Sequence, residues 1–78
     1  MLKITRSGER LKLEGRLAGE LVEEFVRNSG NNDQLDLGDL DFVDQDGVAA
    51  LREAIGAGAS VLEASPFIRI QLGLSSDA

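Results

Sequence analysis

Residues 35–48, which read LDLGDLDFVDQDGV, constrain the fold of this chain more than any other stretch. Leucines alternate with polar residues at the start of this segment, as is typical of a buried strand. Aspartates follow, and from Val48 onward apolar residues recur at helical spacing. The segment therefore predicts a buried strand, then a polar loop and the first turn of a helix over residues 39–47, with Asp44 and Asp46 at the start of that helix.

The start of a helix attracts negative charge, because its first N–H groups have no partner within the helix and carry a positive partial charge. Here the chain supplies that charge itself, since Asp44 fits the capping position and Asp46 falls in the first turn. Two interpretations are open at this point. The segment is either a capped structural turn or a site at which charge controls binding.

The length of 78 residues predicts a single small domain over residues 1–78. A domain of this size buries only about 60% of the surface that its unfolded chain exposes. It has no room for both a core and a deep substrate cleft. We therefore expect a shallow surface site or a binding face.

The composition argues against enzymatic and metal-dependent functions. The chain has no Cys and no His, which removes thiolate chemistry, the commonest general base and the commonest zinc ligand. Its serines have no histidine to activate them as nucleophiles. We expect a protein that is not an enzyme and that uses no cofactor.

The net charge of −6, from 14 acidic and 8 basic residues, disfavours contact with nucleic acid or anionic lipid. No apolar run approaches the ~20 residues that a transmembrane helix needs, so we expect no direct membrane insertion. The N-terminus is too short and too polar for a signal peptide. A cytoplasmic location is the default expectation.

Apolar periodicity along the rest of the chain predicts the remaining elements. Alternation indicates two strands, near residues 2–5 and 11–14, joined by a turn at Ser7-Gly8. The elements that follow are a helix within residues 17–27, the strand at 35–37, a helix capped by Asp44 and closed by residues 56–58, and a strand at 61–62. Residues 68–72 alternate like a strand and also satisfy helical spacing; because Ser65-Pro66 begins a helix well, we predict a helix there. The order β-β-α-β-α-β-α indicates an α/β fold with helices packed on a mixed four-stranded sheet. Residues 74–78 are expected to fray.

The aspartates raise the question of a calcium site, because they stand close together at positions 36, 39, 41, 44 and 46. A partial EF-hand register places Asp44, Asp46, Gly47 and Glu53 at loop positions three, five, six and twelve. Position one is then Phe42, which cannot bind a metal. We therefore expect no metal site, and we interpret the carboxylates as a helix cap, a first-turn residue and solvated turn residues.

Five of the eight basic residues belong to the predicted N-terminal hairpin: Lys3, Arg6, Arg10, Lys12 and Arg16. A solvated strand face accounts for them, and a local anion contact is the alternative. The glycines form neither a P-loop nor a dinucleotide-binding motif.

Three stretches of the sequence resemble a STAS domain, the fold of bacterial anti-sigma factor antagonists. Residues 13–17 (LEGRL) resemble the family's second strand and the turn into its first helix, and residues 64–68 (ASPFI) resemble the start of its last helix. Residues 35–48 resemble the family's strand–loop–helix signature, commonly L-D-L-S-x-V-x-F-I-D-S-S-G-L. The three stretches span nearly the whole chain, and the central one is the most specific.

The resemblance implies a non-catalytic role in partner-switching signalling and transcription regulation. In this family, the antagonist binds a kinase-type anti-sigma factor through the face around the D-S-S-G loop, and phosphorylation of the second serine breaks the complex. Gln45 and Asp46 stand at the two serine positions here, and neither can accept phosphate from a serine kinase. The partner-binding residues that the resemblance implies are Asp39, Asp41, Asp44, Gln45, Asp46, Gly47, Val48 and Leu51.

Asp46 itself has two interpretations. It carries one charge where a phosphoserine carries about −1.5 to −2, so it imitates the modified state only in part. Alternatively, it is a favourable first-turn carboxylate with no partner. Two other functions stay open: an accessory subunit of a membrane transporter, which small STAS proteins also resemble, and a small regulatory domain that binds a nucleotide or anion.

Overall fold

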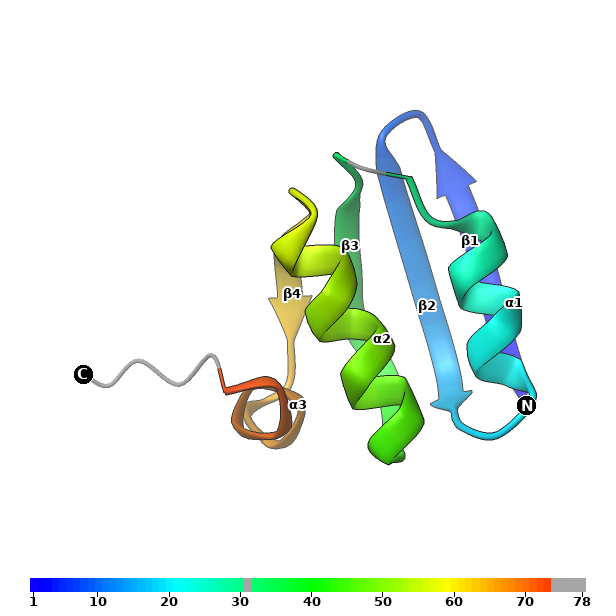
Figure 1. Ribbon diagram of the computed structural model, residues 1–78, viewed down its shortest axis with the longest axis vertical. Helices are drawn as coiled ribbons and strands as arrows, with labels where there is room; N and C mark the ends of the chain where they lie inside the picture. Colours follow the sequence, from blue (N-terminus) through cyan, green and yellow to red (C-terminus); the bar gives the residue numbers. More distant parts are fainter. Residues whose placement is uncertain (31, 74–78) are drawn as a thin grey trace.

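The sheet contains four strands, in the spatial order β1 (Leu2–Ser7), β2 (Arg10–Leu17), β3 (Gln34–Val43) and β4 (Ser60–Ala64) (Figure 1). β1 and β2 pair antiparallel, whereas β2 with β3 and β3 with β4 pair in parallel. The computed structural model describes residues 1–30 and 32–73. The predicted hairpin and the predicted mixed sheet of four strands are confirmed.

The helices each follow one of the last three strands along the chain: α1 (Leu21–Asn28), α2 (Gln45–Gly56) and α3 (Pro66–Leu72). Figure 1 shows α1 and α2 in front of the sheet, with α3 below β4 and to the left of the lower half of α2. The α/β class and the order β-β-α-β-α-β-α are confirmed. Within the described residues, no helix combines the length and the apolar character needed to cross a bilayer. The predicted fraying of residues 74–78 falls outside the part of the chain that the structure describes.

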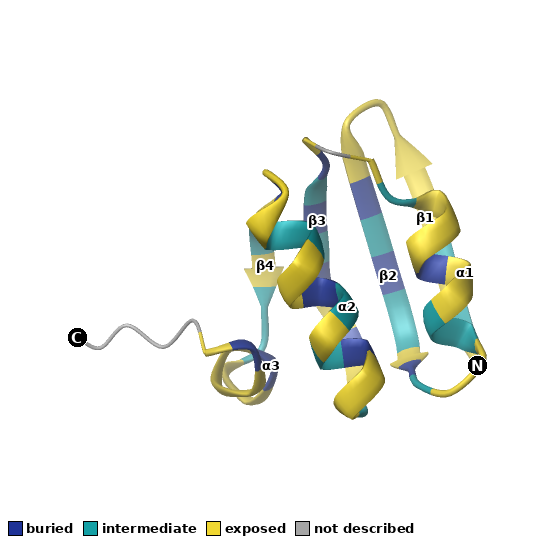
Figure 2. Cartoon of the chain, viewed as in Figure 1, coloured by how far each residue is buried: buried dark blue, intermediate teal, exposed yellow. Residues whose placement is uncertain are grey.

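The hydrophobic core lies between the helices and one face of the sheet. Figure 2 shows buried residues as dark bands on β2, on β3 and on all three helices. The buried apolar side chains are Leu11, Leu13, Leu17, Phe25, Leu35, Leu37, Leu40, Val43, Leu51, Ala59, Ile68 and Leu72. Because every helix contributes to this one cluster, the core fixes the three helices relative to the sheet.

The opposite face of the sheet is polar and carries charges that pair across strands. Lys12, between the core residues of β2, points to this face, and its Nζ lies 3.2 Å from Asp39 Oδ2 and 3.5 Å from Glu14 Oε2. Lys3 Nζ lies 4.0 Å from Glu14 Oε1. The interpretation of a solvated strand face therefore holds for these two lysines.

β3 is longer than the sequence predicts, because two irregularities keep its apolar residues on the core side. Its buried residues are spaced by two, three and three positions, at Leu35, Leu37, Leu40 and Val43. Pairing with β2 shifts by one residue at each three-residue step, as happens where a bulge inserts an extra residue. The prediction of a loop is therefore wrong for residues 39–43, which belong to β3.

α1 begins later than the sequence predicts. Leu17 is the buried last residue of β2, Ala18 lies in the following loop, and the helix begins at Leu21. The delay has a clear cause, because pairing of β2 with β3 continues to Leu17. Val26, which the periodicity placed on the apolar stripe, is 54% exposed.

An ion pair between Arg6 and Asp33 joins segments that are far apart in the sequence. The two guanidinium nitrogens of Arg6 donate to the two carboxylate oxygens of Asp33, at 3.1 and 2.9 Å. The N–H of Gly30 also donates to Asp33, which is only 5% exposed, and Arg6 donates to the carbonyl oxygen of Asn28. The pair thus connects β1, the end of α1 and the residue before β3. The side chain of Arg6 is 41% exposed, as expected of a solvated residue, but its guanidinium is held in an ion pair that the sequence did not indicate.

Replacing Asp33 with Asn should make stability less sensitive to acid. Hydrogen bonding from Arg6, and then from the N–H of Gly30, holds the pKa of Asp33 below its ordinary value. A carboxylate with a depressed pKa contributes stability above the ordinary aspartate pKa of about 3.9, and loses it as the pH falls through the folded-state pKa. Urea unfolding from about pH 6 to about pH 2.5 should therefore show a smaller loss of unfolding free energy for Asp33→Asn than for the wild type.

The matched control is Asp41→Asn, because Asp41 is exposed and forms no ion pair among residues 1–30 and 32–73. This variant should follow the wild-type profile more closely than Asp33→Asn does. If Asp33→Asn and the wild type lose the same free energy on acidification, the Arg6–Asp33 pair is not a source of the pH dependence.

Candidate functional site

The candidate site lies where the parallel strands end and the helices begin. β2, β3 and β4 run in parallel, so their carboxyl ends meet at one edge of the sheet, and a helix starts after each of them. Ligand and partner sites of parallel α/β sheets are commonly found at this edge. The sequence singled out residues 39–48. They lie in the middle of this edge, at the end of β3 and in the first turn of α2.

Asp44 caps α2 and also holds the loop that leads to α1. Its Oδ1 accepts from the N–H of Gly47 at 2.8 Å, and its Oδ2 accepts from the N–H of Gly19 at 3.0 Å. The Gly47 bond, followed by the Gly19 bond, lowers the pKa of the Asp44 carboxyl. The predicted cap is confirmed, and the contact with Gly19 is one that the sequence did not indicate. Because this carboxylate accepts the N–H of Gly47 and places its own negative charge at the start of α2, the geometry counts against an external anion at that position.

Gly47 is required by close packing, not by an unusual backbone angle. A Cβ placed on it would lie 2.5 Å from the carbonyl oxygen of Leu17 and 2.5 Å from a methyl group of Val43. Contacts that short do not occur in folded proteins, so any larger residue would push the first turn of α2 away from the end of β2. The same contact brings Asp44 within reach of Gly19.

The remaining predicted residues of α2 divide into exposed and buried ones. Gln45 and Asp46 lie in the first turn with exposed side chains, and Val48 is half-buried. Leu51 is 0% exposed and belongs to the core. Leu51 therefore supports this surface from beneath and cannot touch a partner.

Asp39 and Asp41 lie in β3 and are not residues of a polar loop. Asp39 pairs with Lys12 across the open face of the sheet, at 3.2 Å. Asp41 is exposed and has no ion pair in the described part of the chain. The structure thus does not gather the aspartates into one cluster, and among residues 1–30 and 32–73 no three acidic side chains converge in the way a metal site requires.

An open hollow of about 520 Å³ lies beside the first turn of α2. Phe42, 37% exposed, is among its lining residues, and the guanidinium carbon of Arg16 lies 4.7 Å from the centre of the Phe42 ring. The lining is completed by Val43, Asp44, Gln45, Val48 and Gln71. Sequence reasoning missed both Phe42 and Gln71. The exposure of Phe42 follows from the second bulge of β3, which periodicity does not reveal.

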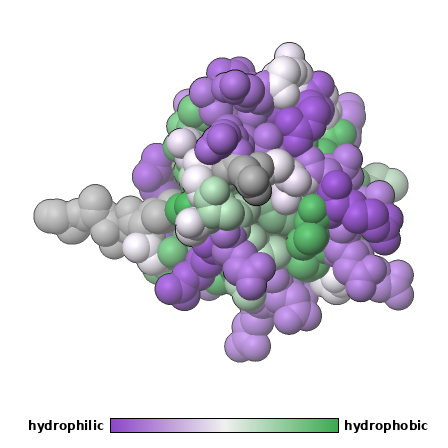
Figure 3. Space-filling model, turned by 45° about the horizontal axis from the view of Figure 1, so that its top comes forward, coloured by the Kyte–Doolittle hydropathy of each residue, from purple (hydrophilic) through white to green (hydrophobic). Residues whose placement is uncertain are grey.

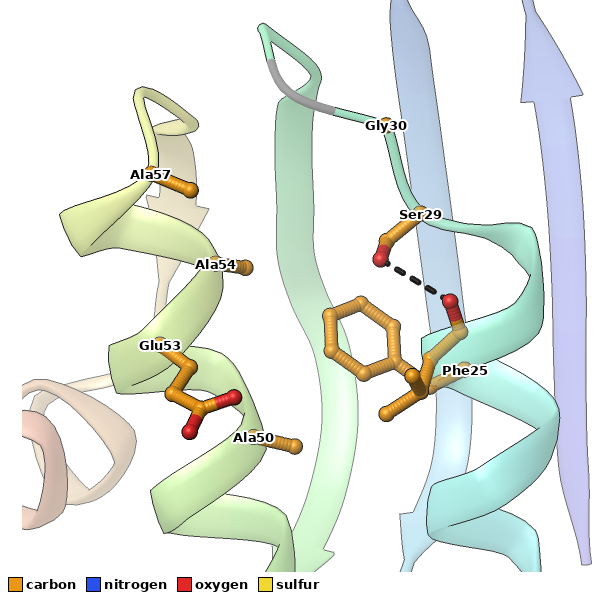
Figure 4. A pocket seen from close by; sticks show the side chains of 8 residues that line it. Phe25, Ser29, Gly30, Ala50, Glu53, Ala54 and Ala57 are labelled. Carbon is orange, nitrogen blue, oxygen red and sulfur yellow. Dashed lines mark hydrogen bonds between the residues drawn. The ribbon is translucent and has the colours of Figure 1, made fainter.

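A second, smaller hollow of about 170 Å³ lies between α1 and α2 (Figure 4). Ala50 and Ala54 of α2, and Ala57 just after its end, point across it toward Phe25 of α1. Figure 3 shows hydrophobic surface framed by hydrophilic residues. Glu53 is the one ionisable residue that lines the hollow. A single carboxylate among small apolar side chains gives this hollow no pair of groups for acid–base chemistry.

Comparison with known proteins adds no assignment to this geometry. The sequence matches no protein-family model, and no curated protein matches it. The candidate site therefore rests on its own contacts: a rigid first turn held by Asp44 and Gly47, two exposed side chains at positions 45 and 46, and an apolar hollow beside them.

Replacing Gly47 with Ala should destabilise the protein by about 1–3 kcal/mol, because the new methyl group would overlap the carbonyl oxygen of Leu17. Gly56 is the matched control, since it lies in the same helix and a Cβ there would meet no atom within 4 Å. Gly56→Ala should be neutral or stabilising by about 0.5–1 kcal/mol, because Ala favours the helix. Urea unfolding measures both, and a Gly47→Ala variant as stable as the wild type would refute the close packing.

Proposed function

We propose that this chain is a non-catalytic protein-interaction module of STAS type that resembles anti-sigma factor antagonists and binds its partner through the first turn of α2. The observation that carries the proposal is the presentation of Gln45 and Asp46. Both side chains are exposed, yet the turn that holds them is fixed by the Asp44 bonds and by the packing of Gly47. A preformed turn loses little freedom when a partner binds it, which favours recognition.

The geometry supports protein binding over the binding of a nucleotide or anion at this helix end. Asp44 already accepts the N–H groups of Gly47 and Gly19, so a phosphate would have to displace a carboxylate of the chain itself. The adjacent hollow is open and partly apolar, with Phe42 and Val48 in its lining. Such a surface suits the side chains of another protein better than it suits a phosphate.

A kinase-type anti-sigma factor is the partner class that the sequence resemblance suggests. Asp46 occupies the position of the family's switchable serine, so in this proposal the first turn of α2 keeps one negative charge at all times. The charge then sets which partner binds, in place of a phosphorylation cycle that adds about −1.5 to −2 charges.

Asp46→Ser should change the affinity for the cognate partner by roughly fivefold, because it removes a fixed charge from the rim of the contact surface. The partner is identified by affinity capture and mass spectrometry, and the dissociation constant is then measured by titration. Glu24→Ser is the control, since it removes an exposed carboxylate from α1, away from the proposed surface. If Asp46→Ser and the wild type bind the partner with equal affinity, the role assigned to Asp46 is contradicted.

A kinase-type anti-sigma factor incubated with ATP should leave residues 44–47 of the wild type unmodified, because none of these side chains carries a hydroxyl group. Peptide mapping by mass spectrometry is the measurement. Asp46→Ser serves as the positive control, since it restores a hydroxyl at this position. A wild-type phosphopeptide from residues 44–47 would contradict the proposal of a fixed charge.

A further inference from the structure

One carboxylate serves the starts of two helices. Asp44 Oδ1 accepts from the N–H of Gly47 in the first turn of α2, at 2.8 Å, and Asp44 Oδ2 accepts from the N–H of Gly19 in the loop before α1, at 3.0 Å. Glu20, the residue that precedes α1, forms no side-chain capping bond of its own. Because negative charge is favourable at the start of a helix, the Asp44 carboxylate stabilises both helix starts. The loop before α1 and the first turn of α2 therefore share one acceptor.

Gly19 reaches Asp44 because of its backbone conformation. Its φ of +58° lies in the left-handed region, which residues with a Cβ adopt only at a cost. Space does not require a glycine here, since a Cβ on Gly19 would meet no atom within 4 Å. The carbonyl oxygen of Gly19 accepts from the N–H of Val22 in the first turn of α1, at 3.1 Å. The backbone of Gly19 therefore sets the direction of the N–H that holds Asp44 and also leads the chain into α1.

The bond from Gly19 fixes the plane of the Asp44 carboxylate. Rotation about the bond between Cβ and the carboxylate carbon is only weakly restricted in aspartate, so a carboxylate held at a single oxygen can turn. With both oxygens held, Oδ1 stays directed at the N–H of Gly47, which caps the turn that exposes Gln45 and Asp46. The orientation of this exposed turn thus depends on a backbone N–H that lies 25 positions before Asp44 in the chain.

We propose that Gly19 is a positioning residue for the partner-binding turn: its left-handed backbone holds the Asp44 carboxylate and, through it, the first turn of α2. This inference rests on the proposed function and adds to it a residue that acts on the contact surface without a side chain. A turn that is held before the partner arrives loses less freedom on binding. A substitution at position 19 that turns the N–H away therefore weakens partner binding, although Gln45 and Asp46 are unchanged.

Gly19→Val tests the inference, because a β-branched residue is strongly disfavoured at positive φ and would turn the N–H away from Asp44. The pKa of the Asp44 carboxyl is lowered by the Gly47 bond and, second, by the Gly19 bond, so NMR titration of this carboxyl should show a higher pKa in the variant. The dissociation constant for the cognate partner should rise roughly fivefold. Gly19→Asn should bring both values back toward those of the wild type, because Asn adopts the left-handed conformation more readily than Val.

Gly8 provides the matched control, because it has the same backbone conformation and, within the described residues, no N–H bond to a carboxylate. Its φ is +63°, and a Cβ on it would also meet no atom within 4 Å. It lies in the turn between β1 and β2, at the opposite end of β2 from Gly19 (Figure 1). Gly8→Val should destabilise the protein in urea unfolding, as Gly19→Val does, but should leave the Asp44 pKa and the partner affinity as in the wild type.

Two results would overturn the inference: an Asp44 pKa that is the same in Gly19→Val and the wild type, or equal partner affinities of Gly19→Val and Gly8→Val. Circular dichroism establishes that each variant folds. If Gly19→Val does not fold, Gly19→Ala replaces it with a smaller side chain and less strain, and Gly8→Ala becomes its control.

The pKa measurement needs no partner, so it separates this inference from the proposed function. If the Asp44 pKa rises in Gly19→Val but no kinase-type anti-sigma factor binds the wild type, the coupling between the loop and the turn stands and the proposed function fails. If the partner responds to Asp46→Ser but binds Gly19→Val as tightly as the wild type, the proposed function stands and the positioning role of Gly19 fails.

Discussion

The structure depends above all on the carboxylate of Asp44, which joins the start of α2 to the loop before α1. Its two oxygens accept from N–H groups that belong to different segments, Gly47 and Gly19. The N–H of Asp44 in turn donates to the carbonyl oxygen of Leu17 at the end of β2, at 3.2 Å. One residue therefore links the end of β2, the loop before α1 and the start of α2 at the edge of the sheet. The exposed side chains of the first turn take no part in this network, so they can be substituted without loss of the fold.

The role of each aspartate follows from its place in the strand register and not from its distance along the chain. Asp39 turns to the open face of the sheet and pairs with Lys12, whereas Asp44 turns inward and caps a helix. Both outcomes depend on the bulges of β3, which keep Leu40 and Val43 in the core and so decide which neighbours face solvent. An acidic segment that looks uniform in the sequence thus contains a cap at Asp44, a cross-strand pair at Asp39, a local acceptor for the N–H of Gly38 at Asp36, and two exposed carboxylates without an ion pair in the described part of the chain, Asp41 and Asp46.

Much of the fold could be predicted from the sequence, because its signals are local. Alternation located the strands, and the caps at Asp44 and Ser65 located the starts of two helices; Ser65 Oγ accepts from the N–H of Ile68 as a cap should. The bulges, the late start of α1 and the Arg6–Asp33 pair could not be predicted in this way, because each depends on contacts between distant segments. The pair joins residues 27 positions apart, and no periodic pattern carries that information.

The candidate site was predictable only in its central part. The residue pattern pointed to Gln45 and Asp46, but it gave no account of Phe42, whose exposure depends on a bulge. A signal for α3 was present in its composition, since PFIRIQL has more apolar residues than one helix face can bury. That signal is ambiguous without the structure, because a helix packed on two sides has the same composition.

Phe67 and Ile70 of α3 leave apolar surface outside the core. In a chain of 78 residues the core is small, and burial of Phe67 and Ile70 would add stability at roughly 25 cal/mol per Å² of apolar surface. These side chains are exposed instead. Rigidity lowers the entropy lost on association, and uncovered apolar surface provides the free energy gained. A fixed first turn of α2 and exposed apolar side chains would thus both favour the protein binding that we propose for this chain.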